Sequence, residues 1–239
     1  MKVGTLERLY SYSQDRLYRD CPMKYKFRYI DNIQEPSNKN LELGTNIHKL
    51  FETYINQEDN TEAIKAIDKS VLPMYTLKLR TEIDEFYKYV NTKTAFVEQT
   101  INTDKFTARI DLISQRDMIV DNYADVVNIY TLTDFKVTKK PKTEDSVYEE
   151  GQLLFYKWLF HEATNYSPDY IYVQYVNISP FLKEQLINPT ELFYADWDTC
   201  TKFVEQMDKN IDSINKGDFP KHKKWCNWCF YKDRCENSK

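Results

Sequence analysis

Three of the five cysteines lie in the last fourteen residues, in the segment CNWCFYKDRC. The spacing C-x2-C-x5-C places three sulfur ligands on one short stretch of chain, so a fourth ligand has to come from elsewhere. The fold is therefore expected to bring a distant segment back to the C-terminal tail. The N-terminal residues MKVGTLERLY contain no apolar secretory core, which predicts a cytoplasmic protein. In a reducing compartment, clustered cysteines hold metals more often than they form disulfides.

Two classes of protein are excluded by the sequence. The four glycines stand at positions 4, 44, 151 and 217, so there is no phosphate-binding G-x-x-x-x-G-K-[ST] loop and the chain is not an ATPase motor. The longest apolar runs, LLFY and WLF, are far shorter than a membrane span, so no membrane partner is expected. A chain of 239 residues can bury one large core, and we expect one domain over residues 1–239.

The N-terminal part of the sequence has helical character. Ser11 or Ser13 can cap a first helix, which Pro22 restarts and which runs to about Ile30. Thr45 is the expected cap of the next helix. The later helices of this part are predicted at about 46–57, 61–71 and 75–91.

The pattern changes after residue 93. The runs with strand character are AFVEQTIN, KFTARIDLIS, NIYTLTDFKV, DYIYVQYV and, as a fifth candidate, ELFYADW. The first two flank Thr103-Asp104, which predicts a hairpin. EEGQLLFYKWLFHEA has apolar residues at helical spacing, and a last helix is expected over 198–216.

This order of elements predicts a mixed α/β fold, with an α+β arrangement of helices on the faces of a mixed sheet. The expected organisation is a helical N-terminal part (1–93), a core sheet (94–197), and a C-terminal helix with the cysteine tail (198–239).

Basic residues are clustered, although the net charge is −4. Residues 15–28 contain five basic side chains against two aspartates, and residues 136–142 contain four lysines and no acid. Local patches, rather than net charge, contact phosphates, so binding to nucleic acid is compatible with the sequence. Each patch taken alone can equally be an ordinary solvated face.

Acidic and basic side chains occur together on two consecutive predicted strands. Asp134 and Lys136 share one face, about 7 Å apart, because side chains alternate along a strand. Asp111 lies in the apolar run ARIDLI, where a carboxylate is costly to bury without a partner. If the strands are neighbours, two carboxylates and an ammonium converge, which favours Mg²⁺ or Mn²⁺ with the Phe135 carbonyl as another ligand. A single D-x-K sequence also occurs by chance, so this alternative stays open.

Such an ion can bind a phosphate and lower the pKa of a bound water, and Lys136 can orient that water or stabilise developing negative charge. Two further residues are ambiguous from the sequence. His48, in GTNIHKLFE, is more often a core or surface histidine than a ligand at such a place. Glu98, in FVEQT, can be an exposed strand residue.

Five segments occur in an order that resembles the PD-(D/E)XK nuclease superfamily, and most closely its RecB-like branch, which includes the exonuclease of CRISPR adaptation and the AddB nuclease domain. The segments are SYSQDRLYRDCPMKYKFRYI, LGTNIHKLFE, ARIDLI, LTDFK and GQLLFYKWL. The resemblance extends from about residue 10 to 236. It implies a restriction-endonuclease-like core sheet flanked by helices.

The resemblance also implies roles for matching positions. They are His48 as a metal ligand, Asp111 and Asp134 as the motif acids, Lys136 as the motif lysine, and Gln152 and Tyr156 as the Q-x3-Y helix beside the site. Glu98 matches an acid that some members carry on the first strand. Ala108 and Arg109 depart from the pattern, because many relatives have glycine before the aspartate. Arg109 is expected either to reach DNA or to project into solvent.

In the iron-sulfur members of this branch, one cysteine near the N-terminus joins three at the C-terminus. By this resemblance Cys21 completes a set with Cys226, Cys229 and Cys235, and the expected cofactor is a 4Fe-4S cluster. Zinc held by the same four sulfurs is the chemical alternative. Cys200, on a predicted helix, is expected to be a small buried hydrophobe instead.

The expected activity is that of a Mg²⁺- or Mn²⁺-dependent deoxyribonuclease, an exonuclease acting on single-stranded or frayed DNA. One alternative is a non-catalytic DNA-binding iron-sulfur subunit of a recombination, repair or CRISPR-adaptation complex. Another keeps the nuclease chemistry and adds a separate helicase as partner, which the missing phosphate loop allows.

Overall fold

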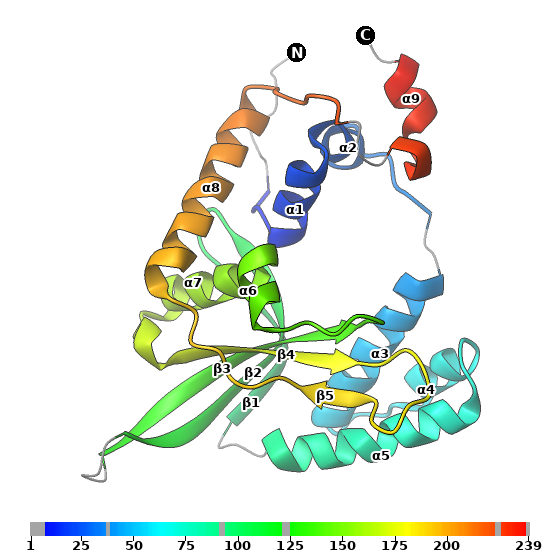
Figure 1. Cartoon of the computed structure of the whole chain (residues 1–239), viewed down its shortest axis with the longest axis vertical. Helices are drawn as coiled ribbons and strands as arrows, with labels where there is room; N and C mark the ends of the chain where they lie inside the picture. The colour runs from blue at the N-terminus through cyan, green and yellow to red at the C-terminus, as the bar shows by residue number, and fades with distance from the viewer. Residues whose placement is uncertain (1–7, 37–38, 91–93, 121–124, 223–225, 238–239) are drawn as a thin grey trace.

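The computed structural model describes residues 8–36, 39–90, 94–120, 125–222 and 226–237. At its centre is a five-stranded mixed sheet with the strand order β1-β2-β3-β4-β5 (Figure 1). The strands are β1 (Thr94–Asn102), β2 (Thr107–Val120), β3 (Asp125–Val137), β4 (Ile171–Ile178) and β5 (Ile187–Pro189). β1, β2 and β3 are antiparallel, β4 is parallel to β3, and β5 is antiparallel to β4. The predicted mixed α/β fold is confirmed.

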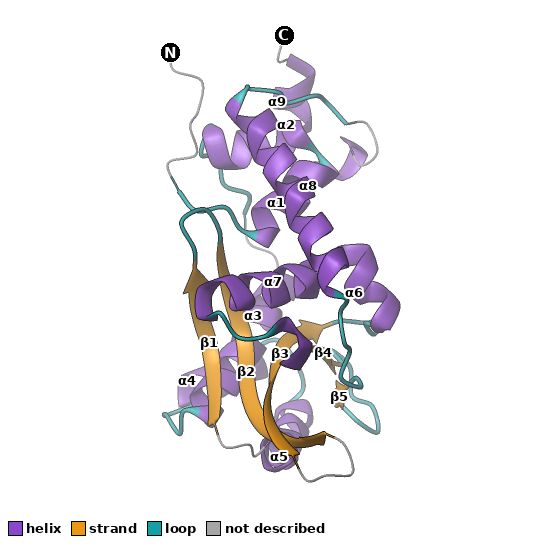
Figure 2. Cartoon of the chain, turned by 90° about the vertical axis from the view of Figure 1, so that its left-hand side faces the viewer, coloured by secondary structure: helices purple, strands orange, loops and turns teal. Residues whose placement is uncertain are grey.

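Helices cover both faces of the sheet. The helices of the described residues are α1 (Tyr12–Asp20), α2 (Pro22–Tyr25), α3 (Lys39–Ile55), α4 (Thr61–Asp68), α5 (Pro73–Val90), α6 (Glu144–Glu150), α7 (Gln152–Thr164), α8 (Trp197–Asn215) and α9 (Lys232–Asn237), with short helical turns at Lys26–Ile30, Pro168–Tyr170 and Cys226–Trp228. Figure 2 shows α7 on one face and α3, α4 and α5 on the other. Each face has its own apolar core, one shared with α1, α7 and α8 and the other with α3, α4 and α5. Within the described residues, no helix is both long and apolar enough to cross a membrane.

The first helical pair forms as predicted, and the cap of the next helix does not. Ser11 Oγ accepts a hydrogen bond from the backbone N–H of Gln14, and Pro22 begins α2. Thr45, predicted to cap a helix, lies inside α3, where its hydroxyl donates to the Leu41 carbonyl. The helix starts earlier because Leu43 is buried on the same face as the following turns and extends its apolar stripe.

The predicted helix over EEGQLLFYKWLFHEA is two helices that meet at Gly151. This residue has φ 80°, a left-handed conformation that ends α6 and starts α7. A Cβ at position 151 would overlap the ring of Phe203 in α8. Glycine is therefore required both for the turn and for the close approach of α8. The turn places Gln152 at the first position of α7, facing the sheet.

Gly151→Ala is expected to lower the free energy of unfolding by about 2–4 kcal/mol, because it combines a left-handed backbone with overpacking against Phe203. Urea denaturation measures this change. Gly44→Ala is the matched control, since Gly44 lies within α3 with nothing within 4 Å of an added Cβ. That control should be neutral or stabilising by about 0.5–1 kcal/mol. Equal effects of the two substitutions would contradict the packing argument.

The fifth strand is not where the sequence suggested. ELFYADW contributes only an isolated bridge between Phe193 and Val173, and the strand beside β4 is β5. The end of the segment instead caps α8, because the Asp196 carboxylate accepts a hydrogen bond from the backbone N–H of Thr199, 2.8 Å away.

Helix α7 is anchored to this segment by a buried lysine. Lys157 is fully buried, its ammonium donates to the Ala195 carbonyl at 2.7 Å, and it lies 4.0 Å from the centre of the Tyr194 ring. Burial lowers the pKa of Lys157 from 10.5 to about 8. Between these two values the unfolded chain binds more protons at this position than the folded chain, so this lysine makes stability rise with pH.

Replacing Lys157 with methionine should remove that contribution. We expect wild type to gain stability relative to Lys157→Met as the pH rises. Between pH 8 and pH 9.5 the gain in unfolding free energy should be about 1–2 kcal/mol. Chemical denaturation of both proteins at a series of pH values measures it. The comparison cancels the titration of other groups common to both proteins, and parallel stability curves would refute the assignment.

Candidate active site

A cavity of about 580 Å³ lies between α3, the sheet and α7. All seven residues predicted for the catalytic and metal site line it: His48, Asp111, Asp134, Phe135, Lys136, Gln152 and Tyr156. They come from two strands, β2 and β3, and two helices, α3 and α7, that are far apart in the sequence. The structure also adds Glu98 and Arg109 to the lining.

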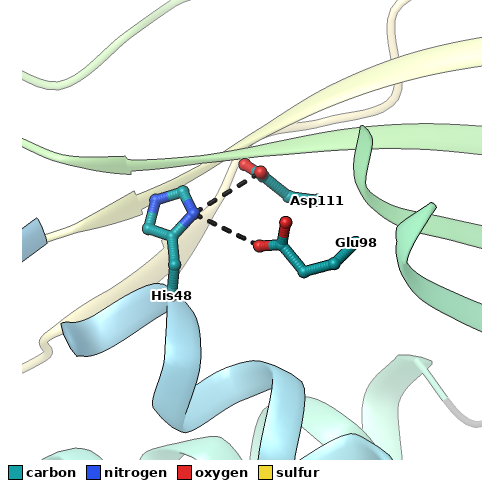
Figure 3. Close-up of side chains that lie close together, drawn as sticks. All are labelled: His48, Glu98 and Asp111. Carbon is teal, nitrogen blue, oxygen red and sulfur yellow. Dashed lines mark ion pairs between the residues drawn. The ribbon is translucent and has the colours of Figure 1, made fainter. Parts of the chain in front are cut away.

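Within this cavity one histidine and two carboxylates form a compact group. His48 Nδ1 lies 3.4 Å from an oxygen of Asp111 and 3.7 Å from an oxygen of Glu98. Figure 3 shows the imidazole reaching from α3 toward both acids. One ligand atom of each residue lies within 4.8 Å of the others, so the group can hold a metal ion. Two hard carboxylate oxygens and one imidazole suit Mg²⁺ or Mn²⁺.

The hairpin register positions the two acids of this group. Val97 pairs with Leu112 and Gln99 pairs with Ile110, so Glu98 and Asp111 are opposite each other. Both strands change faces here, because Val97 and Leu112 pack in the core beside α3 while Ile110 packs in the core beside α7. Glu98 itself has φ 52°, an uncommon left-handed conformation for a non-glycine residue. This local irregularity directs both carboxylates toward His48.

The remaining predicted residues form a hydrogen-bonded chain on the α7 side. Lys136 Nζ lies 2.8 Å from Asp134 Oδ2 and donates to Gln152 Oε1 at 2.8 Å. The Gln152 amide donates to Asp134 Oδ1 and to the Tyr156 hydroxyl, both at 2.7 Å. Gln152 therefore fixes the relative positions of the buried acid and the lysine. The predicted placement of Asp134 and Lys136 on the same strand face agrees with these contacts.

A backbone contact connects the two halves of the site. The N–H of Phe135 donates to Asp111 Oδ2 at 2.6 Å, which ties the acid of β2 to the backbone of β3. The Phe135 ring points into the core beside α3, 5.9 Å from the His48 ring. Asp134 is not part of the His48–Glu98–Asp111 group and lies beside it in the same cavity.

The charges of the site depend on one another. Burial lowers the pKa of His48, but hydrogen bonds to Asp111 and Glu98 raise it more, to about 10. Burial likewise lowers the pKa of Lys136, and the Asp134 carboxylate outweighs it, so the lysine stays an ammonium. Burial raises the pKa of Asp134 above its usual range despite the neighbouring ammonium. A metal bound at His48 would take the place of its proton.

Arg109 pairs with acids of the site, rather than reaching freely into solvent. Its Nε lies 2.5 Å from Glu98 Oε2, and an Nη atom lies 3.8 Å from Glu52 Oε1. Its side chain is still 59% exposed. Arg109 thereby contacts one oxygen of Glu98 while His48 approaches the other. The sequence leaves the roles of Glu98 and Arg109 open. In the observed register Arg109 is opposite Thr100, so its long side chain reaches Glu98 diagonally, two residues along β1.

The structure brings the C-terminal tail back to the N-terminal helices, as the cysteine spacing required. Cys21, Cys226, Cys229 and Cys235 line one cavity of about 250 Å³ between α2 and the tail. The Tyr231 hydroxyl donates to the Ile33 carbonyl at 2.6 Å, and the Tyr231 ring stacks on Phe27 with centroids 5.3 Å apart. Cys200 is fully buried in the core beside α7, where burial raises its pKa to about 12.

The four sulfurs of this cavity are more widely spaced than a single zinc ion would require. Tetrahedral zinc, with Zn–S bonds of about 2.3 Å, places its sulfurs roughly 3.8 Å apart. Among the described residues, the only group of three ligands lying within 4.8 Å of one another is the one at His48, so no three of these sulfurs meet that limit. Four thiolates that line one cavity are also a donor set that an iron-sulfur cluster can use.

A family model described as the PD-(D/E)XK nuclease superfamily matches residues 10–236. The chain belongs to this superfamily. The segment LTDFK contains a D-x-K sequence at Asp134 and Lys136, which line the cavity, and this sequence matches the (D/E)XK of the superfamily's name. The family is one of nucleases, so the chemistry expected of this cavity is hydrolysis of a phosphodiester bond.

Solved structures also resemble the chain. A protein from Eubacterium rectale, named "Putative exonuclease", aligns over 97% of this chain and 89% of its own, with a TM-score of 0.63 and 12% sequence identity. That likeness shows a shared fold. The structure of SSO0001 aligns over 90% of this chain and 93% of its own at 17% identity, with a TM-score of 0.33 that is too low to bear on the fold. No curated protein matches the sequence.

Proposed function

We propose that the chain is a metal-dependent DNA nuclease whose metal site is built on His48, Glu98 and Asp111. The observation that carries the proposal is the contact of this three-ligand group with the Asp134–Lys136–Gln152 chain in one cavity. Asp134 and the Phe135 carbonyl are proposed as further ligands, because both residues line the same cavity. A divalent ion held here would bind a phosphate oxygen and lower the pKa of a bound water.

The other residues of the cavity have separate proposed roles in catalysis and positioning. Lys136 is an ammonium in the cavity and would donate a hydrogen bond to the attacking water or to a phosphate oxygen as negative charge develops. Gln152 is proposed as a positioning residue, because its amide holds both Asp134 and Lys136. Tyr156 supports Gln152 and donates to the Arg109 carbonyl at 3.2 Å. Its burial raises its pKa well above the ordinary value, so Tyr156 stays protonated.

The proposed substrate is single-stranded or frayed DNA, digested as by an exonuclease. The lysine-rich segment 136–142 leaves the cavity at the end of β3 and would guide the phosphate backbone. The name of the Eubacterium rectale protein is in line with this proposal. A separate helicase or a recombination or CRISPR-adaptation protein is the proposed partner, and the missing phosphate loop is compatible with a separate helicase.

We also place the chain in the RecB-like iron-sulfur branch, with a 4Fe-4S cluster held by Cys21, Cys226, Cys229 and Cys235. The support is the shared cavity of the four cysteines and the wide spacing of their sulfurs. The proposed role of the cluster is structural, because it would hold the two ends of the chain together beside the nuclease core.

The proposal is tested with anaerobically purified protein and labelled single- and double-stranded DNA. We expect release of nucleotides from single strands in Mg²⁺ or Mn²⁺, and none when EDTA is present. DNA binding without cleavage in either metal would favour the non-catalytic iron-sulfur subunit instead. Metal analysis and the visible spectrum of the same preparation distinguish iron from zinc at the cysteine cavity.

A further inference from the structure

An exposed aromatic ring lies beside the exit of the active-site strand. β3 and β4 are parallel, with Val137 paired to Ile178, so the two chains leave the sheet side by side. The connection continues past the strand ends, where the Thr138 N–H donates to the Ile178 carbonyl at 3.0 Å. Just beyond, the Lys139 ammonium lies 5.0 Å from the centre of the Phe181 ring.

Both chain segments at this point are held by local hydrogen bonds. The Thr138 hydroxyl donates to the Lys140 carbonyl at 2.8 Å and accepts from the Lys140 N–H at 3.1 Å. The Ser179 hydroxyl makes the same pair of contacts with the backbone of Phe181, at 3.1 and 3.3 Å. The Tyr75 hydroxyl of α5 then fastens the Ser179 carbonyl at 2.5 Å. The ring and the lysines are thus presented on supported turns.

We call Phe181, Lys139 and Lys140 together the platform. Its side chains suit a single-stranded nucleic acid, which carries negative phosphates and flat bases. Phe181 is 47% exposed, so its ring is accessible to a ligand as well as to Lys139. Lys139 and Lys140 are both exposed, and in the described part of the chain neither has a carboxylate within the 4.0 Å of an ion pair. A ring with a cation beside it and a free basic neighbour is the combination used to bind unpaired nucleic acid, where bases stack and ammonium groups follow the phosphates.

We propose that Phe181 stacks an unpaired base of the substrate next to the cleaved bond, while Lys139 and Lys140 contact the flanking phosphates. This inference rests on the proposed nuclease function and concerns which form of DNA the site prefers. Lys139 is three residues from Lys136, about 10 Å along an extended chain, so the platform is within reach of a nucleotide adjacent to the reacting phosphate. Bases inside a duplex are stacked on one another and cannot offer a face to Phe181, so the platform favours single-stranded or frayed ends.

Binding to oligothymidylates that carry one abasic residue tests the proposal. Full-length protein with Asp134→Asn, in Ca²⁺, is titrated against a fluorescent oligothymidylate and a series in which the abasic residue moves along the strand. With Phe181 present, one position is expected to weaken binding about 5- to 100-fold, the range of one base–aromatic stack. In the same Asp134→Asn background, Phe181→Ala should weaken binding of the intact strand by the same factor. The affinity of this double variant should not depend on where the abasic residue lies.

Two variants serve as controls. Phe181→Tyr keeps a stacking face and should retain the position-dependent loss. Leu182→Ala removes a neighbouring side chain of similar exposure, 46%, and should bind like the parent protein. A loss of affinity in Leu182→Ala equal to that in Phe181→Ala would overturn the proposal and indicate a general apolar surface.

Cleavage by protein with an intact Asp134 is measured in parallel with Mg²⁺ or Mn²⁺. Suppose that DNA is cleaved, but that the protein with Phe181 binds the oligonucleotides equally well whatever the position of the abasic residue. This result would reject the stacking site and leave the nuclease proposal standing. A position-dependent scan without any cleavage would reject the nuclease proposal and retain a base-stacking site. Failure to bind any oligonucleotide would reject both.

Discussion

Changing Asp111 to asparagine should reduce DNA cleavage by about a thousandfold or more. Asp111 contributes one negative charge to the three-ligand group, and one of its oxygens accepts the Phe135 N–H. Asparagine retains an acceptor for that N–H, so the junction of β2 and β3 is preserved while the charge is lost. Metal ions contribute several kcal/mol to such reactions, and 1.36 kcal/mol corresponds to a factor of ten in rate.

The decisive measurement is the single-turnover cleavage rate in Mg²⁺ and Mn²⁺, together with the melting temperature. Asp104→Asn is the matched control, because it removes the same charge from an exposed residue of the β1–β2 turn. The control should cleave at the wild-type rate. An Asp111→Asn protein that folds normally and keeps its activity would exclude Asp111 from the metal site, and the site would then have to be centred on Asp134.

Much of the fold follows from local sequence patterns. The strand carrying LTDFK and the helix carrying LLFYKWLF are found where periodicity placed them, because their alternating or helical apolar residues match the cores on both faces. The errors occur where a local signal competes with packing. Thr45 looks like a cap, but the apolar stripe of α3 continues through it. The run around Phe193 has strand character, yet only one of its residues bridges to β4.

The metal group was harder to predict than the strands, because it depends on register. A two-residue loop at Thr103-Asp104 would place Glu98 opposite Arg109. The observed hairpin pairs Asn102 with Thr107, and this longer loop moves Glu98 opposite Asp111. A shift of register determines which side chains meet, and no single-residue pattern reveals it. The left-handed φ of Glu98 is likewise invisible in the sequence.

The cysteine tail illustrates the opposite case, in which spacing alone predicted a long-range contact. Three sulfurs in a short segment required a fourth ligand, and the structure places Cys21 in the cavity of the other three. The packing that supports this return, through Tyr231 against Phe27 and the Ile33 carbonyl, had no clear signature in the sequence. These contacts explain how the tail can reach α2, and the proposed cluster would add a covalent tie between them.

Changing Cys229 to serine is therefore expected to give colourless, poorly soluble protein with a large loss of stability. The proposed cluster closes a loop of roughly 205 residues between Cys21 and the tail, and by analogy with a disulfide such a closure is worth about 5 kcal/mol. That is comparable to the whole stability of many domains. The measurements are iron and zinc content, the visible spectrum, and chemical denaturation of protein purified without oxygen.

Cys200→Ala separates loss of the cluster from loss of a buried sulfur. Cys200 is fully buried in a core away from the cysteine cavity, so its replacement should cost about 1–2 kcal/mol and leave metal content unchanged. Cys229 is only partly buried, and the packing lost on its replacement is therefore smaller than that at Cys200. A greater loss of stability at Cys229 than at Cys200 must then come from the ligand bond. If Cys229→Ser retains both its metal and its stability, the tail is held by Tyr231 and its neighbours alone, and the cluster has no structural role.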